Sequence, residues 1–314
     1  MSNQRPMFPH TFDSTMIGAA RSCQHKMFRQ YMQHWKPKTE SVHLVAGGAF
    51  AKGLEVARKA FFEQGASRDE AVAAGLHALL IAYGDFECPP ESPKSAERTA
   101  GAFEFYMDYY PLGECGMDPI ALANGSRGIE FSFAEPLDVC HPVTGNPILY
   151  TGRSDMIATF AGGAYIEDDK TTSSLGPSWA RQWELRSQFT GYTWAARRAG
   201  IKVDGAIIRG VSILKTKYDT QQAITYRNDY EVNRWYDQVN RDIEKLIQSW
   251  KDGWYDFNLD HACAEFGGCT FQQICKSPDP ETWLPMYFEQ RVWDPLARRE
   301  LTVQEWEESW GHNV

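Results

Sequence analysis

The pattern of hydrophobic and polar positions predicts that the first third of the chain is helical. Residues 13–35 have helical periodicity, with Asp13 and Ser14 as suitable N-cap residues. Residues 45–64 are rich in small and apolar residues and predict a second helix. Residues 67–110 predict two further helices, separated by a proline-containing turn at Glu87-Cys-Pro-Pro-Glu.

The middle of the chain changes to the periodicity of strands. Apolar and polar residues alternate within 127–139, which predicts a strand that leads into a hairpin of two further strands. These are residues 148–155 and 164–172, which flank Gly162-Gly163, a dipeptide suited to a hairpin turn. The sequence therefore predicts three successive strands.

The pattern then returns to a helix. Residues 179–198 have apolar positions at helical spacing, 203–214 form a mostly apolar run typical of a buried parallel strand, and 229–250 predict a long amphipathic helix. The order strand–strand–strand–helix–strand predicts an α/β fold with helical additions at both ends of the chain.

Composition places the chain among globular proteins. It has 314 residues, of which 43% are hydrophobic and 23% are charged, enough for a substantial core. No apolar stretch is long enough to cross a bilayer, and Met1-Ser-Asn-Gln-Arg-Pro lacks the apolar centre of a signal peptide. We therefore expect no membrane partner and a cytoplasmic location. In that compartment the seven cysteines are expected to be thiols or metal ligands.

The charge distribution is uneven. A net charge of −9 argues against a general nucleic-acid binder. Residues 179–218 are locally basic, because they hold eight Lys and Arg residues and only Glu184 and Asp204 as acids. This run predicts either a phosphate-contacting surface or an ordinary solvated helix face. Its basic residues are Arg181, Arg186, Arg197, Arg198, Lys202, Arg209, Lys215 and Lys217.

The predicted hairpin has the residues of a metal site. Asp168 and Lys170 are two apart and share one face of their strand, and Asp155 ends the polar part of the preceding strand. Two carboxylates and an ammonium group suit a hard divalent cation. An isolated Asp-x-Lys is more often a solvated strand face or a surface ion pair. The spacing to Asp155 and the helical pair Gln188 and Tyr192 favour the site.

These residues resemble a known family. Gly152-Arg-Ser-Asp155, Asp168-Asp-Lys170-Thr and Gln188-x-x-x-Tyr192 are similar to motifs of the PD-(D/E)XK nuclease superfamily, and within it to the RecB-type branch that includes phage exonucleases. The resemblance implies a mixed sheet flanked by helices and Mg²⁺- or Mn²⁺-dependent hydrolysis of DNA. Asp155 and Asp168 would bind the metal, and Lys170 would position or activate the attacking water. Gln188 and Tyr192 would orient the motif and the DNA backbone.

A further motif lies in the second predicted helix. Gly47, Leu54 and Glu55 match the family element Gly-x-x-x-His-x-x-Leu-Glu, but Ala51 replaces the histidine. The resemblance therefore implies an all-oxygen site that suits Mg²⁺, in which Glu55 contributes directly or through water. Glu55 is equally well explained as a surface glutamate. The expected metal ligands are Asp155, Asp168, the Asp169 carbonyl group and Glu55.

The cysteines near the C-terminus give a second metal signal. Cys263, Cys269 and Cys275 lie within thirteen residues. In the cluster-bearing RecB-type enzymes one more ligand comes from the N-terminal helix, which implies Cys23 and a [4Fe-4S] cluster. The spacing differs from the family's Cys-x2-Cys-x5-Cys, so zinc or no metal remains an alternative, with His261 as an alternative ligand. Cys88, Cys115 and Cys140 are expected to be structural.

The leading interpretation is a single nuclease domain over residues 1–314. It has a helical part (1–125), a catalytic core (126–220) and a C-terminal helical, Cys-rich part (221–314). We expect a metal-dependent DNA exonuclease of phage or bacterial recombination and repair, with DNA and a recombinase or single-strand-binding protein as partners. The alternatives are a DNA-binding scaffold with an inactive core and an RNA-directed nuclease. ATP-driven helicase activity is not expected, because the sequence has no Gly-Lys-Ser/Thr loop.

Overall fold

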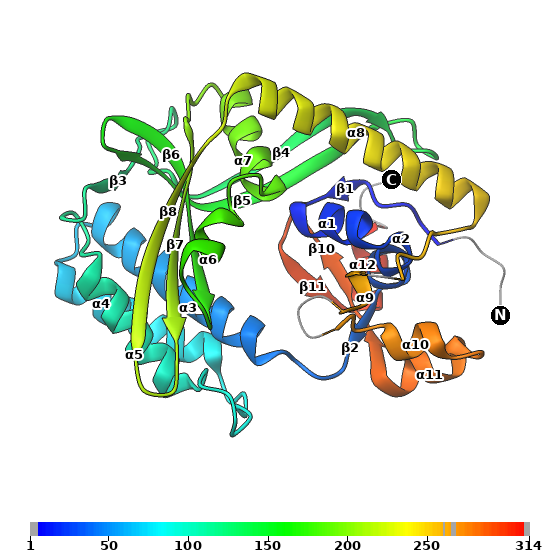
Figure 1. Ribbon diagram of the computed structural model, residues 1–314. Helices are drawn as coiled ribbons and strands as arrows, with labels where there is room; N and C mark the ends of the chain where they lie inside the picture. Colours follow the sequence, from blue (N-terminus) through cyan, green and yellow to red (C-terminus); the bar gives the residue numbers. More distant parts are fainter. Residues whose placement is uncertain (1–5, 260, 265–267, 311–314) are drawn as a thin grey trace. The chain divides into compact units, whose positions relative to one another are not determined.

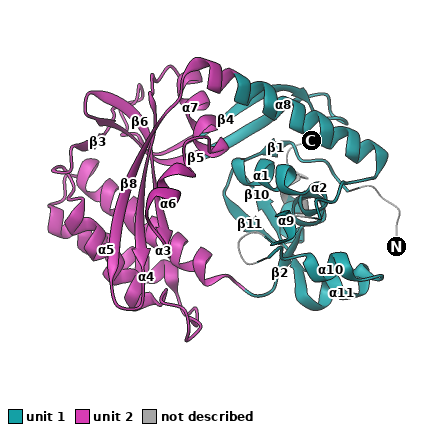
Figure 2. Ribbon diagram, viewed as in Figure 1, with its two compact units in different colours: residues 1–39, 133–152, 234–314 teal, residues 40–132, 153–233 magenta. Residues whose placement is uncertain are grey.

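The computed structural model describes residues 6–259, 261–264 and 268–310, and the chain folds into two compact units. One unit is built from residues 1–39, 133–152 and 234–314, and the other from 40–132 and 153–233 (Figure 2). We call them the terminal unit and the core unit. The chain passes between the two units several times, so neither is a continuous stretch of sequence.

The core unit begins with three helices and continues through most of a sheet (Figure 1). Ser67 and Glu70 form a capping box at the start of its second helix, as their spacing favours. The elements from residue 40 to 233 are α3 (Val42–Phe62), α4 (Arg68–Tyr83), α5 (Ala96–Tyr109), β3 (Met117–Pro119), β4 (Ile129–Cys140), β5 (Pro147–Phe160), β6 (Gly163–Thr172), α6 (Pro177–Arg181), α7 (Ser187–Arg198), β7 (Gly205–Ile213), β8 (Tyr218–Tyr226) and the start of α8 (Asp229–Asp252).

Strands β5, β6, β7 and β8 are neighbours in a mixed sheet. β5 and β6 pair antiparallel, β6 and β7 pair parallel, and β7 and β8 pair antiparallel. The β5–β6 hairpin turns at Ala161 and Gly162, which both have positive φ, rather than at Gly162-Gly163. All nine residues of β7 are buried, as the apolar run 203–214 predicts.

The two faces of β7 have different neighbours. Val211 and Ile213 join the apolar core of α3, α4 and α5. Gly210 points to the other face, where a Cβ atom would overlap the Trp179 ring of α6. Because adjacent strand residues point to opposite faces, α3–α5 and α6 cover opposite sides of the sheet. The mixed sheet flanked by helices confirms the predicted fold class.

The single helix predicted for 179–198 is wrong, because the structure divides it into α6 and α7. In between, backbone hydrogen bonds shift to shorter spacing, such as Glu184 N to Arg181 O and Arg186 N to Trp183 O. Arg227 Nη2 donates to the Trp183 carbonyl at 2.9 Å, which removes that acceptor from a continuous helix. Leu185 consequently lies in the connection and is exposed.

The terminal unit combines the N-terminal and C-terminal segments. β2 pairs antiparallel with β9, and the buried Arg29 forms an ion pair of 2.8 Å with Glu281. These contacts join segments more than 240 residues apart in sequence. Its remaining elements are β1 (Thr11–Phe12), α1 (Ser14–Ser22), α2 (Gln24–Met27), the π-helix η1 (Phe28–Met32), β2 (Trp35–Pro37), α9 (His261–Ala264), α10 (Gln272–Lys276), α11 (Pro280–Tyr287), β9 (Phe288–Gln290), β10 (Val292–Asp294), β11 (Arg299–Leu301) and α12 (Val303–Trp310).

The helix predicted for 13–35 is interrupted at Cys23. Asp13 caps α1 as expected and accepts hydrogen bonds from Thr15 N and Met16 N. Cys23 then has extended backbone, with φ −163° and ψ 118°, and the chain restarts as α2. The described helices include none long and apolar enough to cross a membrane. The assignment of residues 1–314 to a single nuclease domain with three parts stays a prediction.

Candidate active site

Asp155 and Asp168 lie where strands β5 and β6 separate. The strand pairing of this hairpin runs from Phe160 with Gly163 to Met156 with Glu167. Asp155 and Asp168 are the next residues on each strand. Asp155 Oδ2 instead accepts a hydrogen bond of 2.9 Å from the backbone N–H of Asp169. The divergence of the strands therefore leaves room for two carboxylates at one end of the hairpin.

Lys170 provides the positive charge at this point. Its ammonium group forms an ion pair with Asp168, which lies on the same face of β6. Burial lowers the pKa of Lys170, but Asp168 and Asp155 outweigh burial and raise it above the usual value. Lys170 is therefore a cationic hydrogen-bond donor here, suited to hold a water molecule or to stabilise negative charge.

The two carboxylates carry more negative charge than Lys170 offsets. Burial, and next the charge of Asp168, raise the pKa of Asp155 to about 8. Burial also raises the pKa of Asp168, against the opposing effect of Lys170. Among the described residues, no group of three or more His, Cys, Asp or Glu side chains could hold a metal ion. Two carboxylates nevertheless fit Mg²⁺, which proteins often bind through one or two carboxylates together with water and substrate phosphate.

Helix α7 brings Gln188 and Tyr192 to the same site. Gln188 Nε2 donates to the Tyr192 hydroxyl oxygen at 3.2 Å, as their spacing of four on a helix allows. Burial and then the Asp168 charge raise the pKa of the Tyr192 hydroxyl. The tyrosine is therefore a neutral hydroxyl close to the carboxylates. The structure thus brings together Asp155, Asp168, Lys170, Gln188 and Tyr192.

Glu55 has other partners in the structure. On α3 its two carboxylate oxygens pair with Lys52 at 3.0 Å and Lys59 at 2.8 Å. Burial alone would raise the pKa of Glu55, but these two lysines lower it. The metal-binding role of Glu55 stays a prediction, and in the described geometry its carboxylate is held by lysines of its own helix. Ala51, one turn earlier, lies on the same helix.

The side chain of Asp169 points away from Asp168, onto the α3 face of the strand. There Arg58 Nη2 lies 2.7 Å from Asp169 Oδ2 and 2.9 Å from Glu167 Oε1, and all three residues are buried. The Tyr106 hydroxyl donates to Asp169 Oδ1. This buried ionic cluster of Arg58, Glu167, Asp169 and Tyr106 supports Asp155 indirectly, because the Asp169 N–H holds the Asp155 carboxylate.

The sequence analysis missed Arg58 and Tyr106. One signal was present in the sequence, because Arg58 interrupts the apolar stripe of α3 between Leu54 and Phe61. A charge in such a stripe predicts a buried partner. The partners Glu167 and Asp169 are two residues apart on β6 and therefore share one face of the strand. Only the tertiary structure shows that this face is directed toward α3.

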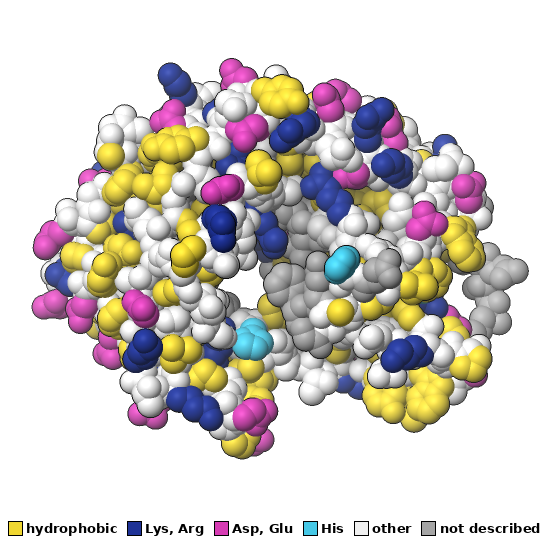
Figure 3. Space-filling model, in the orientation of Figure 1, with side chains coloured by type: hydrophobic (Ala, Val, Ile, Leu, Met, Phe, Trp, Pro, Cys, Tyr) yellow, Lys and Arg dark blue, Asp and Glu magenta, His cyan; other side chains and the backbone are white. Residues whose placement is uncertain are grey.

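The basic segment 179–218 does not form one exposed surface. Arg209 is buried and packs over the Tyr110 ring at 4.0 Å, and Arg197 donates to the carbonyl oxygens of Val203 and Arg227. Acidic and basic side chains are interspersed on the face drawn in Figure 3. Part of the local positive charge therefore stabilises the fold.

Cys23, Cys263, Cys269 and Cys275 all line one small cavity of the terminal unit. Burial, followed by the neighbouring Cys269, Cys23 and Cys263, raises the pKa of the Cys275 thiol. The donor set is that of a tetrathiolate site. Within the described residues, however, no three of these or other His, Cys, Asp or Glu side chains are arranged to hold a metal ion. Residues 265–267, between Cys263 and Cys269, are not among the described residues. His261 lies on α9 and is exposed.

A family comparison agrees with this geometry. The model of the PD-(D/E)XK nuclease superfamily matches residues 18–276. The chain belongs to the PD-(D/E)XK nuclease superfamily. The match spans the candidate active site and extends to all four clustered cysteines. Membership implies a phosphodiester hydrolase with a nucleic-acid substrate, and enzymes of this superfamily generally use Mg²⁺ or Mn²⁺.

Other comparisons give distant similarities. A crystal structure of a "Putative exonuclease" from Eubacterium rectale matches with 13% identity and a TM-score of 0.48, over 79% of this chain and 85% of that one. A crystal structure of SSO0001 matches with 13% identity and a TM-score of 0.29, over 63% of this chain and 74% of that one. No curated protein matches the chain.

Proposed function

We propose that this protein is an Mg²⁺- or Mn²⁺-dependent DNA exonuclease. The observation that carries the proposal is the convergence of Asp155, Asp168 and Lys170 at the diverging end of the β5–β6 hairpin. Burial and then the charge of Asp168 raise the pKa of Asp155 despite Lys170, and a bound divalent cation would favour the ionised carboxylate. The Gln188–Tyr192 pair, which the sequence associates with the RecB-type branch, supports DNA as the substrate.

Each residue has a defined role in the proposed reaction. Asp155 and Asp168 would hold the divalent cation, which supplies Lewis-acid activation when bound. The Asp169 N–H fixes Asp155, while the Lys170 ammonium positions the attacking water and stabilises the charge that develops on the phosphoryl oxygens. The Tyr192 hydroxyl, oriented by Gln188, would donate to the DNA backbone. Glu55 and the Asp169 carbonyl group remain our proposed further oxygen ligands.

The experiment is cleavage of end-labelled linear, circular and single-stranded DNA, and of RNA, with Mg²⁺ or Mn²⁺. We expect linear DNA to be degraded from its ends and circular DNA to survive. Asp168→Ala and Lys170→Ala should abolish cleavage. Asp118→Ala and Lys215→Ala are matched controls at exposed positions of the same unit and should remain active.

The outcomes separate the alternatives. Cleavage of circular DNA would make the enzyme an endonuclease, and preferential cleavage of RNA would change the substrate. DNA binding without cleavage under any condition would favour the inactive scaffold. A folded Asp168→Ala protein that cuts DNA at the wild-type rate would refute the assigned site. We further propose a role in phage or bacterial recombination and repair, with a recombinase or single-strand-binding partner, which co-purification from the native host would test.

We also propose that the four clustered cysteines bind a [4Fe-4S] cluster, with zinc as the alternative metal. Their common cavity and the raised pKa of the Cys275 thiol support this, because a bound cation would offset four closely placed thiolates. Protein purified without oxygen should contain iron and sulfide and absorb broadly in the visible range. Cys23→Ser should lose the metal, whereas Cys140→Ser, at an exposed cysteine outside the cavity, should retain it.

Metal analysis decides between these possibilities. Stoichiometric zinc without iron would replace the cluster but keep the four-thiolate site. Full metal retention in Cys23→Ser would exclude Cys23 from that site. Metal-free protein that is as stable as the metal-loaded form would exclude a structural metal altogether.

A further inference from the structure

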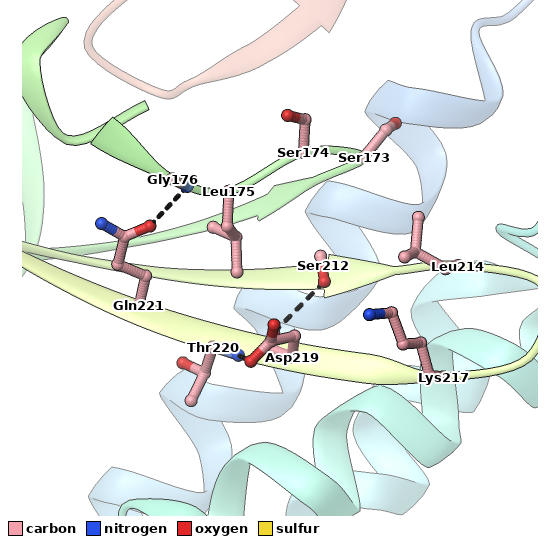
Figure 4. Close-up of a pocket in the computed structure, with 10 residues that line it drawn as sticks. All are labelled: Ser173, Ser174, Leu175, Gly176, Ser212, Leu214, Lys217, Asp219, Thr220 and Gln221. Atoms are coloured by element: carbon pink, nitrogen blue, oxygen red, sulfur yellow. Dashed lines mark hydrogen bonds between the residues drawn. The ribbon is translucent and has the colours of Figure 1, made fainter. Parts of the chain in front are cut away.

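A cavity of about 410 Å³ lies at the carboxyl ends of β6 and β7 (Figure 4). Its wall comes from the loop after β6, which includes Ser173, Ser174 and Leu175, and from the ends of β7 and β8. Ligand sites in open α/β sheets commonly lie beyond the carboxyl ends of parallel strands. The volume is within the range that holds a small molecule.

The cavity shares its face of the sheet with the candidate active site. Lys170 pairs with Gly210, and two residues further along Thr172 pairs with Ser212, which in turn pairs with Asp219. Paired residues of neighbouring strands point to the same face, so Ser212 and Asp219 lie on the face of Lys170. Two strand residues and one strand spacing separate Ser212 from Lys170 by roughly 8 Å, about two stacked nucleotide steps.

The chemistry of the wall suits a nucleotide. Ser173 and Ser174 offer hydroxyl groups that both donate and accept, and Leu175 offers an apolar surface. Ser212 Oγ donates to the Asp219 carbonyl oxygen at 3.4 Å and can still accept a hydrogen bond. Within the described residues, no ion pair engages the exposed Lys217 ammonium group, which is available for a phosphate. One Asp219 oxygen accepts from Thr220 N at 2.9 Å, and the other can accept from an amino group of a base.

The cavity is formed by contacts of its own loop. Gln221 Oε1 accepts from Gly176 N at 2.6 Å, and Thr172 Oγ1 is hydrogen-bonded to the backbone of Ser174 at both N–H and carbonyl. The Gln221 bond ties the loop to β8, and the Thr172 bonds fix the turn of the loop itself, before any ligand is present. A ligand would therefore bind without first ordering the loop, which lowers the entropic cost of binding.

We propose that this cavity binds one nucleotide of the substrate strand, within two nucleotides of the phosphodiester that is cleaved. The proposal rests on the proposed nuclease function for its assignment to the substrate strand. A single monophosphate fits better than a triphosphate, because Lys217 is the cation of the wall and Asp219 partly offsets it. Occupancy of the cavity would fix the position of the strand relative to the carboxylates.

The test is a calorimetric titration of the full-length protein with deoxyadenosine 5′-monophosphate. EDTA is present so that the divalent-metal site does not contribute to binding. Lys217→Glu should weaken binding about tenfold, and Ser174→Trp should abolish it by filling the cavity. Both positions are exposed, so the fold should tolerate the changes. Lys215→Glu is the matched control, because Lys215 is exposed in the same β7–β8 connection but does not line the cavity.

We expect the two cavity variants also to raise KM for a single-stranded oligonucleotide, with Lys215→Glu unchanged. No binding to the wild type at millimolar nucleotide, or equal binding to all four proteins, would overturn the proposal. If the wild type cuts DNA but binds no nucleotide, the proposed role of the cavity would be refuted and the proposed nuclease function would stand. If the protein cuts no nucleic acid but binds the nucleotide, and only the cavity variants lose this binding, the nucleotide site would be supported and the nuclease function refuted.

Discussion

The buried ion pairs of Arg58 give the sharpest test of how the core unit is held together. Arg58→Met keeps most of the side-chain length but leaves Glu167 and Asp169 without their cation. Removal of one partner from a buried ion pair typically costs about 3–5 kcal/mol. For a protein of this size such a loss lowers Tm by roughly 6–20 °C. Lys59→Met, at the next residue, removes a partly exposed ion pair and should cost less than about 1 kcal/mol.

The loss should depend on pH in a defined direction. Burial raises the pKa of Glu167 well above its usual value, while Arg58 opposes the rise. Without Arg58 the folded protein holds this proton more strongly, whereas the unfolded chain releases it near pH 4.3. The variant's deficit should therefore be small near pH 4.5 and grow as pH rises toward 8.

Denaturant unfolding of wild type, Arg58→Met and Lys59→Met at pH 5 and pH 8 measures these differences. Adding Glu167→Gln to Arg58→Met should recover part of the loss, because it removes one uncompensated carboxylate. Equal stability of Arg58→Met and wild type at pH 8 would show that the cluster does not stabilise the folded state. A deficit that is larger at pH 5 than at pH 8 would contradict the assigned direction of the Glu167 pKa shift.

Three further predictions concern the candidate active site and the helices that pack on the two faces of the sheet. Because burial and Asp168 raise the pKa of Asp155 to about 8, metal-free protein should lose stability as pH rises from about 4 to 8. Denaturant unfolding in EDTA tests this, and Asp155→Asn should make the unfolding free energy less dependent on pH. Gly210→Ala should cost about 1–3 kcal/mol, because the new Cβ overlaps the Trp179 ring, and an unchanged Tm would contradict that packing. Ala51→His should increase affinity for Mn²⁺ more than for Mg²⁺, and Glu55→Ala should weaken activity with either metal; metal titrations that show neither effect would mean that α3 does not face the metal.

Much of the core unit follows from local sequence patterns. The alternation of β4, the apolar run of β7 and the caps of α1 and α4 all arise from residues close in sequence, so their elements could be predicted. The hairpin spacing likewise placed Asp155 near Asp168 and Lys170, because strand periodicity fixes which side chains share a face. β8, which mixes exposed, half-buried and buried residues, was not predicted.

What the sequence did not reveal depends on distant contacts. The interruption between α6 and α7 involves Arg227, which lies more than forty residues away from Trp183. The extended backbone at Cys23 similarly separates two segments that each have helical periodicity. The partners of Arg58 come from a strand 109 residues later, and no local pattern indicates them. Such features arise from tertiary packing, which outweighs local propensity.

Strand β6 carries four consecutive charged residues, Glu167 to Lys170, and this has a consequence for folding. A shift of one residue in strand pairing exchanges the two faces of a strand. In a β6 shifted by one residue, Asp168 and Lys170 would lie on the α3 face in place of Glu167 and Asp169. Arg58 and Lys170 would then be buried there with one acid, whereas Arg58 is now buried with two. The unequal charges of the two faces of β6 therefore disfavour misaligned pairing, so the residues proposed for catalysis also help to specify the register of the sheet.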